Sequence, residues 1–210
     1  MAAEVESPRS APERILDAAC DLIAAEGIDE VRIARVATRA GASTALVHHY
    51  FSTREELLEQ ALIHSFEQAG DDRFERPPGT EETATEALAR GIGECLPLPG
   101  SQEREWVLWV ELWLRAVREP ALRPVAARLY DRYREWVAGL IRAGVKGGEF
   151  RADADPEAIA DIAMALLDGA GVRALLRDPA MDVEAAQKLV AERLAAELDL
   201  EPDALLWAGG

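Results

Sequence analysis

The chain has 210 residues and a net charge of −16, with 49% hydrophobic and 30% charged residues, which provides for a sizeable core. It has none of the roughly 18-residue apolar stretches that span a bilayer, no signal-peptide segment near its start, and two cysteines, Cys20 and Cys95, without zinc-site spacing. We therefore expect a cytoplasmic protein without a membrane span, a disulfide, a metal or a cofactor.

Helical periodicity runs through nearly the whole chain and no segment alternates as a strand does, which predicts an all-α fold of about nine helices. A tail over residues 1–10 is expected to be disordered. Ser10 and Glu13 then form a capping box that opens a first helix, and Gly27 suits its end. Two short helices follow at about 33–40 and 44–50.

The second half of the pattern predicts longer helices. Thr53 and Glu56 form another capping box, which opens a helix that continues to about 77–79. Ser101 is expected to cap a helix, and Asp155 caps another whose first residue is Pro156. The remaining predicted helices lie at about 81–95, 102–117, 120–143, 156–176 and 183–198.

Residues 31–51, VRIARVATRAGASTALVHHYF, have the arrangement of a helix-turn-helix. Gly41 suits the turn, Ser43 can cap the second helix, and Val47 can anchor it. Residues 31–54 contain four arginines and no acid, so this window carries +4 and leaves −20 for the rest. DNA binding needs such local positive charge, although a chance gap in the acidic residues would give the same count. The candidate DNA-binding residues are Arg32, Arg35, Ser43, Thr44, Ala45, His48, His49, Tyr50 and Arg54.

Within that set, the second helix can enter a major groove, with Thr44, Ala45, His48 and His49 projecting outward. Tyr50 and Arg54 are expected to reach phosphates, together with free amides at the start of the next helix. Adjacent residues on a helix point about 100° apart, so His48 and His49 are not a metal-chelating pair.

The segment from Arg14 to Leu58 resembles the DNA-binding domain of the TetR family of bacterial regulators. The resemblance rests on RILDAA, LIAAEGI, VRIARVATRAGAS, VHHYF and STREELL, in that order. His48 departs from it, because many members have a phosphate-contacting tyrosine there. The resemblance implies a homodimer through the last two helices and a ligand pocket in the C-terminal domain. WVELWLRAVREPALR, AGVKGGEFRADADPEAIA and LLDGAG are similar to the subgroup that includes the choline-responsive regulator BetI.

Three tryptophans, Trp106, Trp109 and Trp113, lie on one face of the helix predicted at 102–117. They are either core residues or the wall of a ligand pocket, to which Tyr130 and Asp168 can contribute. Tryptophans beside a carboxylate favour a cationic ligand through cation–π contact. Glu111 and Arg115 have the spacing of a solvated ion pair.

Small residues at 169–171 and the stripe Ala186, Val190, Leu194 and Leu198 are expected to pair the helices at 156–176 and 183–198 with their copies. Twofold symmetry then predicts a palindromic operator in double-stranded DNA. The expected organisation is a tail at 1–10, a helix-turn-helix domain at 11–57, and a ligand-binding and dimerisation domain at 58–210.

The sequence lacks GxSxG, phosphate-loop and HExxH motifs, so we do not expect an enzyme. We expect a DNA-binding regulator, in the form of a repressor released from its operator by a small molecule. The alternatives are a ligand-independent regulator and a helical protein-interaction module that does not bind DNA.

Overall fold

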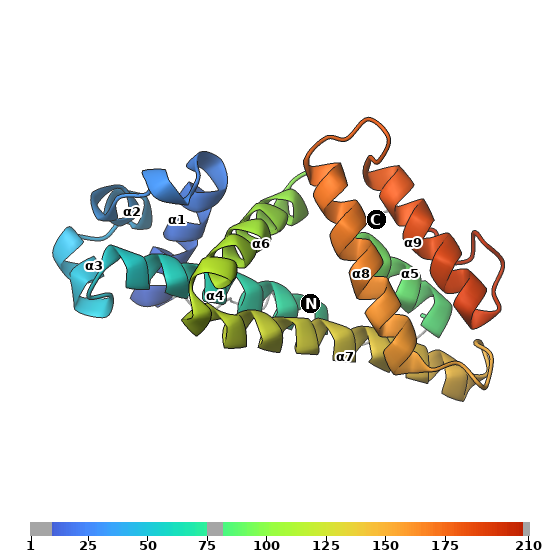
Figure 1. Ribbon diagram of the computed structural model, residues 1–210. Helices are drawn as coiled ribbons and strands as arrows, with labels where there is room; N and C mark the ends of the chain where they lie inside the picture. The colour runs from blue at the N-terminus through green and yellow to red at the C-terminus, as the bar shows by residue number, and fades with distance from the viewer. Residues whose placement is uncertain (1–9, 75–81, 208–210) are drawn as a thin grey trace, which may run out of the picture.

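The computed structural model describes residues 10–74 and 82–207, in which every regular element is helical (Figure 1). The all-α prediction is confirmed. The helices are α1 (Ala11–Glu26), α2 (Ile33–Ala40), α3 (Thr44–Tyr50), α4 (Arg54–Phe74), α5 (Ala84–Glu94), α6 (Ser101–Arg118), α7 (Arg123–Gly147), α8 (Pro156–Leu175) and α9 (Val183–Leu198), with 3-10 turns η1 (Ile28–Glu30) and η2 (Pro120–Leu122). The expected disordered tail and the predicted end of α4 lie outside the described residues, apart from Ser10.

The predicted caps explain where several helices begin. Ser10 and Glu13 form the reciprocal capping box of α1, the Ser43 side chain accepts from the amide of Leu46, and Asp155 caps α8. Gly41 adopts the left-handed conformation with φ of 62°, which glycine reaches without a steric penalty. These local contacts fix the turn between α2 and α3.

Two caps differ from expectation. The amide of Glu56 donates to the Thr53 hydroxyl, but the Glu56 carboxylate accepts from the amide of Ser52 instead of closing the box on Thr53. Ser101 is the first residue of α6, after Gly100, and its hydroxyl donates to the Gln102 side chain. The expected Ser101 cap is therefore wrong, because the helix begins one residue earlier than predicted.

Helices α1–α3 lie at one end of the molecule, and α4 and α7 extend from there towards α5, α8 and α9 (Figure 1). One apolar core joins α1–α4 to the tryptophans of α6, and another lies among α5, α7, α8 and α9. The expected boundary at residue 57 falls inside α4, which is thus shared by both regions. None of the helices in the described ranges is long and apolar enough to cross a membrane.

Candidate functional site

The outer face of α3 presents the side chains that the sequence singled out for base contacts. Thr44, Ala45, His48 and His49 are exposed, whereas Val47 is fully buried and anchors the helix. Ser43 is also exposed while it caps α3. Tyr50 is 42% exposed, and its ring meets that of His49 edge-on, with centroids 5.0 Å apart.

The arginines of the basic window are less available than their number suggests. Arg35 forms a two-pronged ion pair with Glu26, and Arg39 donates to Asp21 at 2.8 and 2.9 Å. Arg32 donates to the carbonyl of Asp29 at 2.5 Å. Glu26 and Asp21 belong to α1, outside the window, so the folded chain offsets much of the local charge that the sequence predicts.

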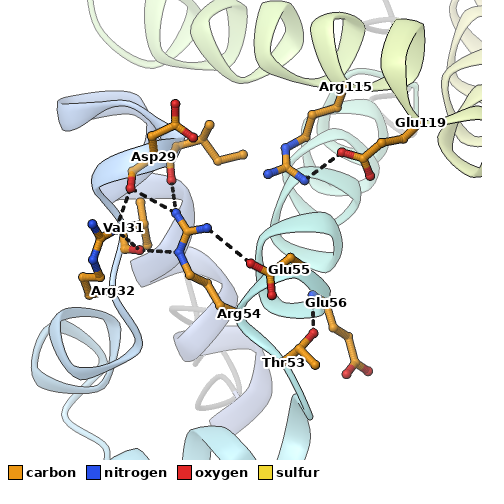
Figure 2. A network of polar contacts seen from close by, with 10 residues as sticks. Asp29, Val31, Arg32, Thr53, Arg54, Glu55, Glu56, Arg115 and Glu119 are labelled. Atoms are coloured by element: carbon orange, nitrogen blue, oxygen red, sulfur yellow. Dashed lines mark hydrogen bonds and ion pairs between the residues drawn. The ribbon is translucent and has the colours of Figure 1, made fainter.

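Arg54 has a position that the sequence did not indicate. Its guanidinium donates to the carbonyls of Val31 and Ile28, each at 2.7 Å, and lies 3.5 Å from the Glu55 carboxylate (Figure 2). The side chain is 26% exposed. These contacts tie the first turn of α4 to the linker between α1 and α2, in place of the expected outward approach to a phosphate. Glu55 also puts negative charge beside the start of α4.

A polar joint connects the α1–α3 end to α6. The Asp21 carboxylate lies 2.7 Å from Nη2 of Arg104 on α6 and also accepts from Arg39 on α2. One carboxylate therefore links three helices. Arg115, also on α6, pairs with Glu119 at 3.4 Å (Figure 2). The expected pair of Arg115 with Glu111 is wrong, because the guanidinium turns towards the end of α6.

A cavity opens between α4, α5, α6, α7 and α8. Trp106 and Trp109 line it and are only 7% and 9% exposed, so they belong to the core as well as to the cavity wall. The Trp109 ring lies 4.6 Å from that of Phe66 and 6.4 Å from that of Tyr133, centroid to centroid. The full lining is Phe66, Glu94, Cys95, Glu105, Trp106, Trp109, Tyr133, Met164, Leu167 and Asp168.

Three carboxylates enter this aromatic cavity, and no lysine or arginine is among the described residues that line it. Glu94 lies 3.3 Å from Arg90, outside the lining. Asp168 accepts a 2.7 Å hydrogen bond from the Tyr130 hydroxyl. Burial raises the pKa of Asp168, against the opposing effect of that hydrogen bond. Burial and the neighbouring carboxylate also raise the pKa of Tyr130.

The candidate ligand residues divide between two places. Trp106, Trp109 and Asp168 line the cavity, whereas Trp113 and Tyr130 line a separate groove that also reaches Asp168. The sequence analysis did not identify Glu94 or Glu105. Glu94 had a detectable signal, because it is a single acid within the apolar run GIGECLPL.

Most of the residues expected to pair two copies face the interior of their own chain, whereas Gly169 is exposed. A Cβ on Gly171 would lie 2.3 Å from the ring of Trp106, so this glycine makes room for an intrachain contact. The α9 stripe is fully buried in the core with α5, α7 and α8. The prediction that the stripe forms the dimer surface is wrong, because periodicity identifies a buried face without identifying what covers it. The stripe comprises Ala186, Val190, Leu194 and Leu198.

Both regions of the chain match models of known protein families. Residues 15–61 match the model of bacterial regulatory proteins of the tetR family, and residues 84–199 match that of the BetI-type transcriptional repressor C-terminal domain. The chain is 27% identical to the HTH-type transcriptional regulator BetI of Brucella anthropi over 88% of its own length and 91% of the relative.

Similar solved structures support the same family. A transcriptional regulator from Saccharomonospora viridis in complex with choline is 33% identical, with a TM-score of 0.76 over 86% of this chain and 93% of that one. The regulator FadR from Bacillus subtilis in complex with stearoyl-CoA has a TM-score of 0.66 at 22% identity, over 88% and 96% of the two chains, and so shares the fold. The chain therefore belongs to the TetR family, as a transcriptional regulator with a helix-turn-helix DNA-binding domain and a ligand-binding C-terminal domain of the BetI type.

Proposed function

We propose that the protein is a homodimeric cytoplasmic repressor that leaves a palindromic operator when a small organic cation of the quaternary ammonium class binds the cavity. The observation that carries this proposal is the combination of aromatic walls and carboxylates without a lining lysine or arginine. The choline complex of a regulator 33% identical to this chain supports the same ligand class.

The chemistry of the cavity suits such a cation. Faces of Trp106, Trp109 and Tyr133 attract a methylated ammonium group, which has no N–H to donate and is best held by cation–π contact. Asp168 supplies the formal counter-charge. Its ionised form is disfavoured by burial, and a bound cation relieves that penalty. Ligand binding is thereby coupled to the charge state of one carboxylate.

On the DNA side, Thr44, Ala45, His48 and His49 are proposed to meet base edges, because they are exposed on the helix that a major groove admits. Ser43, Tyr50, Arg32 and Arg35 flank them and are proposed to contact phosphates. The ion pair of Arg35 with Glu26 is exposed, and such pairs exchange partners at little free-energy cost. We assign Arg54 to positioning of the linker instead.

The homodimer is proposed to form through the outer faces of α8 and α9. Ala158 and Ala165 on α8 are exposed, and Leu189 on α9 is 41% exposed. Small residues seven positions apart let another helix approach closely. In this proposal residues 11–57 form the DNA-binding domain and residues 58–210 the ligand-binding and dimerisation domain.

Coupling between the two sites is proposed to follow α4 and α6. Phe66 on α4 contacts Trp109 at the cavity wall, and Arg104 on α6 holds Asp21 at the other end. A ligand that displaces these helices changes the separation of the two recognition helices in the dimer. A coupling free energy of about 1–3 kcal/mol changes operator affinity roughly 5- to 150-fold.

The test is selection of random duplex DNA by the purified protein, followed by titration of the selected operator with salt and choline. We expect a palindromic consensus, steep salt dependence and release by choline. Operator binding that no organic cation changes would support a ligand-independent regulator instead. No enrichment at low salt from a folded dimer would contradict DNA binding and support a protein-interaction module.

A further inference from the structure

A second hollow, here called the outer groove, adjoins the cavity. It is lined by α6, α7 and α8, three of the five helices that surround the cavity. The cavity uses Trp106 and Trp109 of α6, and the groove uses residues one to two turns further along that helix. On α7 the groove residues precede Tyr133 of the cavity, and on α8 they begin at Asp168 and continue beyond it. Asp168 lines both spaces. The outer groove is lined by Trp113, Ala116, Val117, Arg123, Ala126, Tyr130, Asp168, Gly169 and Val172.

Aromatic rings separate the two spaces: Trp109 lines the cavity, and its ring lies 5.5 Å from that of Trp113 and 5.4 Å from that of Tyr130, centroid to centroid, both of which line the groove. The rings of Trp113 and Tyr130 are nearly parallel, with centroids 6.4 Å apart and an interplanar angle of 7°. The Tyr130 hydroxyl donates to Asp168 at 2.7 Å and closes the layer. A cation that draws Asp168 into its own coordination competes with Tyr130 for the carboxylate. Rotation of one aromatic side chain would then join the cavity to the groove.

Apart from Asp168 and Arg123, the outer groove is lined by apolar and aromatic residues. Val117, which is 72% exposed, lies at its open side. Arg123 is the one basic side chain in the lining, and it donates to the carbonyls of Ala116 and Val117 at 3.2 and 3.3 Å. The inner end therefore offers a carboxylate beside aromatic rings, and the remainder offers hydrocarbon apart from the Arg123 guanidinium, which is held by two backbone carbonyls. This polarity matches a molecule with a cationic head and an alkyl tail.

We propose that the outer groove binds the alkyl tail of an amphiphilic cation whose ammonium head occupies the cavity, with Asp168 between the two parts. This inference rests on the proposed function, because it assigns the cavity to the head. It extends the ligand class from small quaternary ammonium ions to alkyl-trimethylammonium compounds. Trp113 and Tyr130 become residues that determine tail length.

The first test compares tetramethylammonium with its butyl, hexyl and octyl trimethyl analogues, below their micelle concentrations, by calorimetry on the full-length protein. Each methylene buried in the groove is expected to lower Kd about fourfold. Equal affinities across the series would overturn the inference and leave the proposed function intact. No binding of tetramethylammonium, choline or any analogue would contradict the proposed function itself.

Variants locate the tail. Ala126→Trp fills the groove and is expected to abolish the gain with chain length while tetramethylammonium affinity stays unchanged. Ala127→Trp, on an exposed position of the same helix, is the control and keeps the gain. Val117→Gln is on the exposed rim, so folding is unaffected, and it is expected to weaken octyl binding more than butyl binding.

Sedimentation of the same variants distinguishes the tail from another occupant. The dimer is expected to persist in Ala126→Trp. Conversion to monomer by Ala126→Trp, with Ala127→Trp still dimeric, would mean that a second copy of the chain covers the groove, and this would overturn the inference. Full retention of the chain-length gain in both Ala126→Trp and Val117→Gln would overturn it as well.

Discussion

The two ends of the molecule differ in how their charged side chains are partnered and exposed to solvent. At the α1–α3 end, Arg35 and Arg39 are matched by acids of α1 in exposed pairs. At the cavity, the half-buried Asp168 accepts a hydrogen bond from the Tyr130 hydroxyl, and burial raises its pKa. Exposed ion pairs exchange partners at little free-energy cost, so an arginine at the α1–α3 end can leave its carboxylate for a DNA phosphate. At the second end, burial disfavours the ionised carboxylate of Asp168, and a bound cation would stabilise it.

The largest effect is expected from Asp168→Asn. The amide still accepts from Tyr130 but carries no charge, so affinity for tetramethylammonium should fall by at least about 30-fold, as for removal of one partner of a desolvated charge pair. Calorimetry measures the loss. Asp161→Asn on the same helix, where the side chain is 63% exposed, should leave Kd unchanged, and equal losses in both variants would contradict a specific role.

The same substitution has a defined pH dependence. Because burial raises the pKa of Asp168 in the folded state, ionisation of Asp168 destabilises the fold as pH rises above the pKa of the unfolded chain. Asp168→Asn should therefore be more stable than the parent protein at neutral pH, and this advantage should vanish in acid. Thermal denaturation across pH tests it. A gain that grows as pH falls would contradict the assignment.

The next largest effect is a difference in stability between alanine substitutions at two glycines of α8. Gly171→Ala places a Cβ 2.3 Å from the Trp106 ring, so the cavity wall must shift, at a cost of about 1–3 kcal/mol in the free energy of unfolding. Gly169→Ala meets nothing within 4 Å and should stabilise the helix by up to about 1 kcal/mol. Denaturant unfolding compares them. Similar values would mean that Trp106 does not depend on Gly171.

These residues also show what the sequence can and cannot reveal. The starts of α1, α3 and α8 were predictable because Ser10, Ser43 and Asp155 act within three residues along the chain. Contacts between distant segments were not. The periodicity of α9 identified a buried stripe and gave no sign that its own chain covers it. The basic window likewise gave no sign of the acids of α1.

The joint between the two ends predicts a smaller effect. Asp21→Asn weakens the contacts to Arg104 and Arg39 together, so operator affinity without ligand should rise modestly at most, as Arg39 is released, while its response to ligand falls by about 0.5–2 kcal/mol. Operator titrations with and without choline measure the coupling. Asp153→Asn removes a different exposed pair, with Arg151, and should leave the coupling intact. An unchanged response to choline in Asp21→Asn would mean that this joint does not carry the coupling.

The smallest effect tests whether the paired arginines trade partners. The hydrogen bond from Arg35 lowers the pKa of Glu26, so the carboxylate is ionised at neutral pH and must be displaced before a phosphate binds. Glu26→Gln should tighten operator binding modestly and steepen the salt slope by about one if it recruits one phosphate contact.

Glu30→Gln makes the same change of net charge next to the same linker, but Glu30 acts on Arg35 through its charge alone, whereas Glu26 is also hydrogen-bonded to it. A larger slope in Glu26→Gln than in Glu30→Gln would therefore report the freed guanidinium rather than the altered charge. Equal slopes in the two variants would mean that Arg35 stays outside the phosphate contacts. The positive charge that faces the DNA would then have to come from Arg32 and from neighbouring side chains that rearrange on binding.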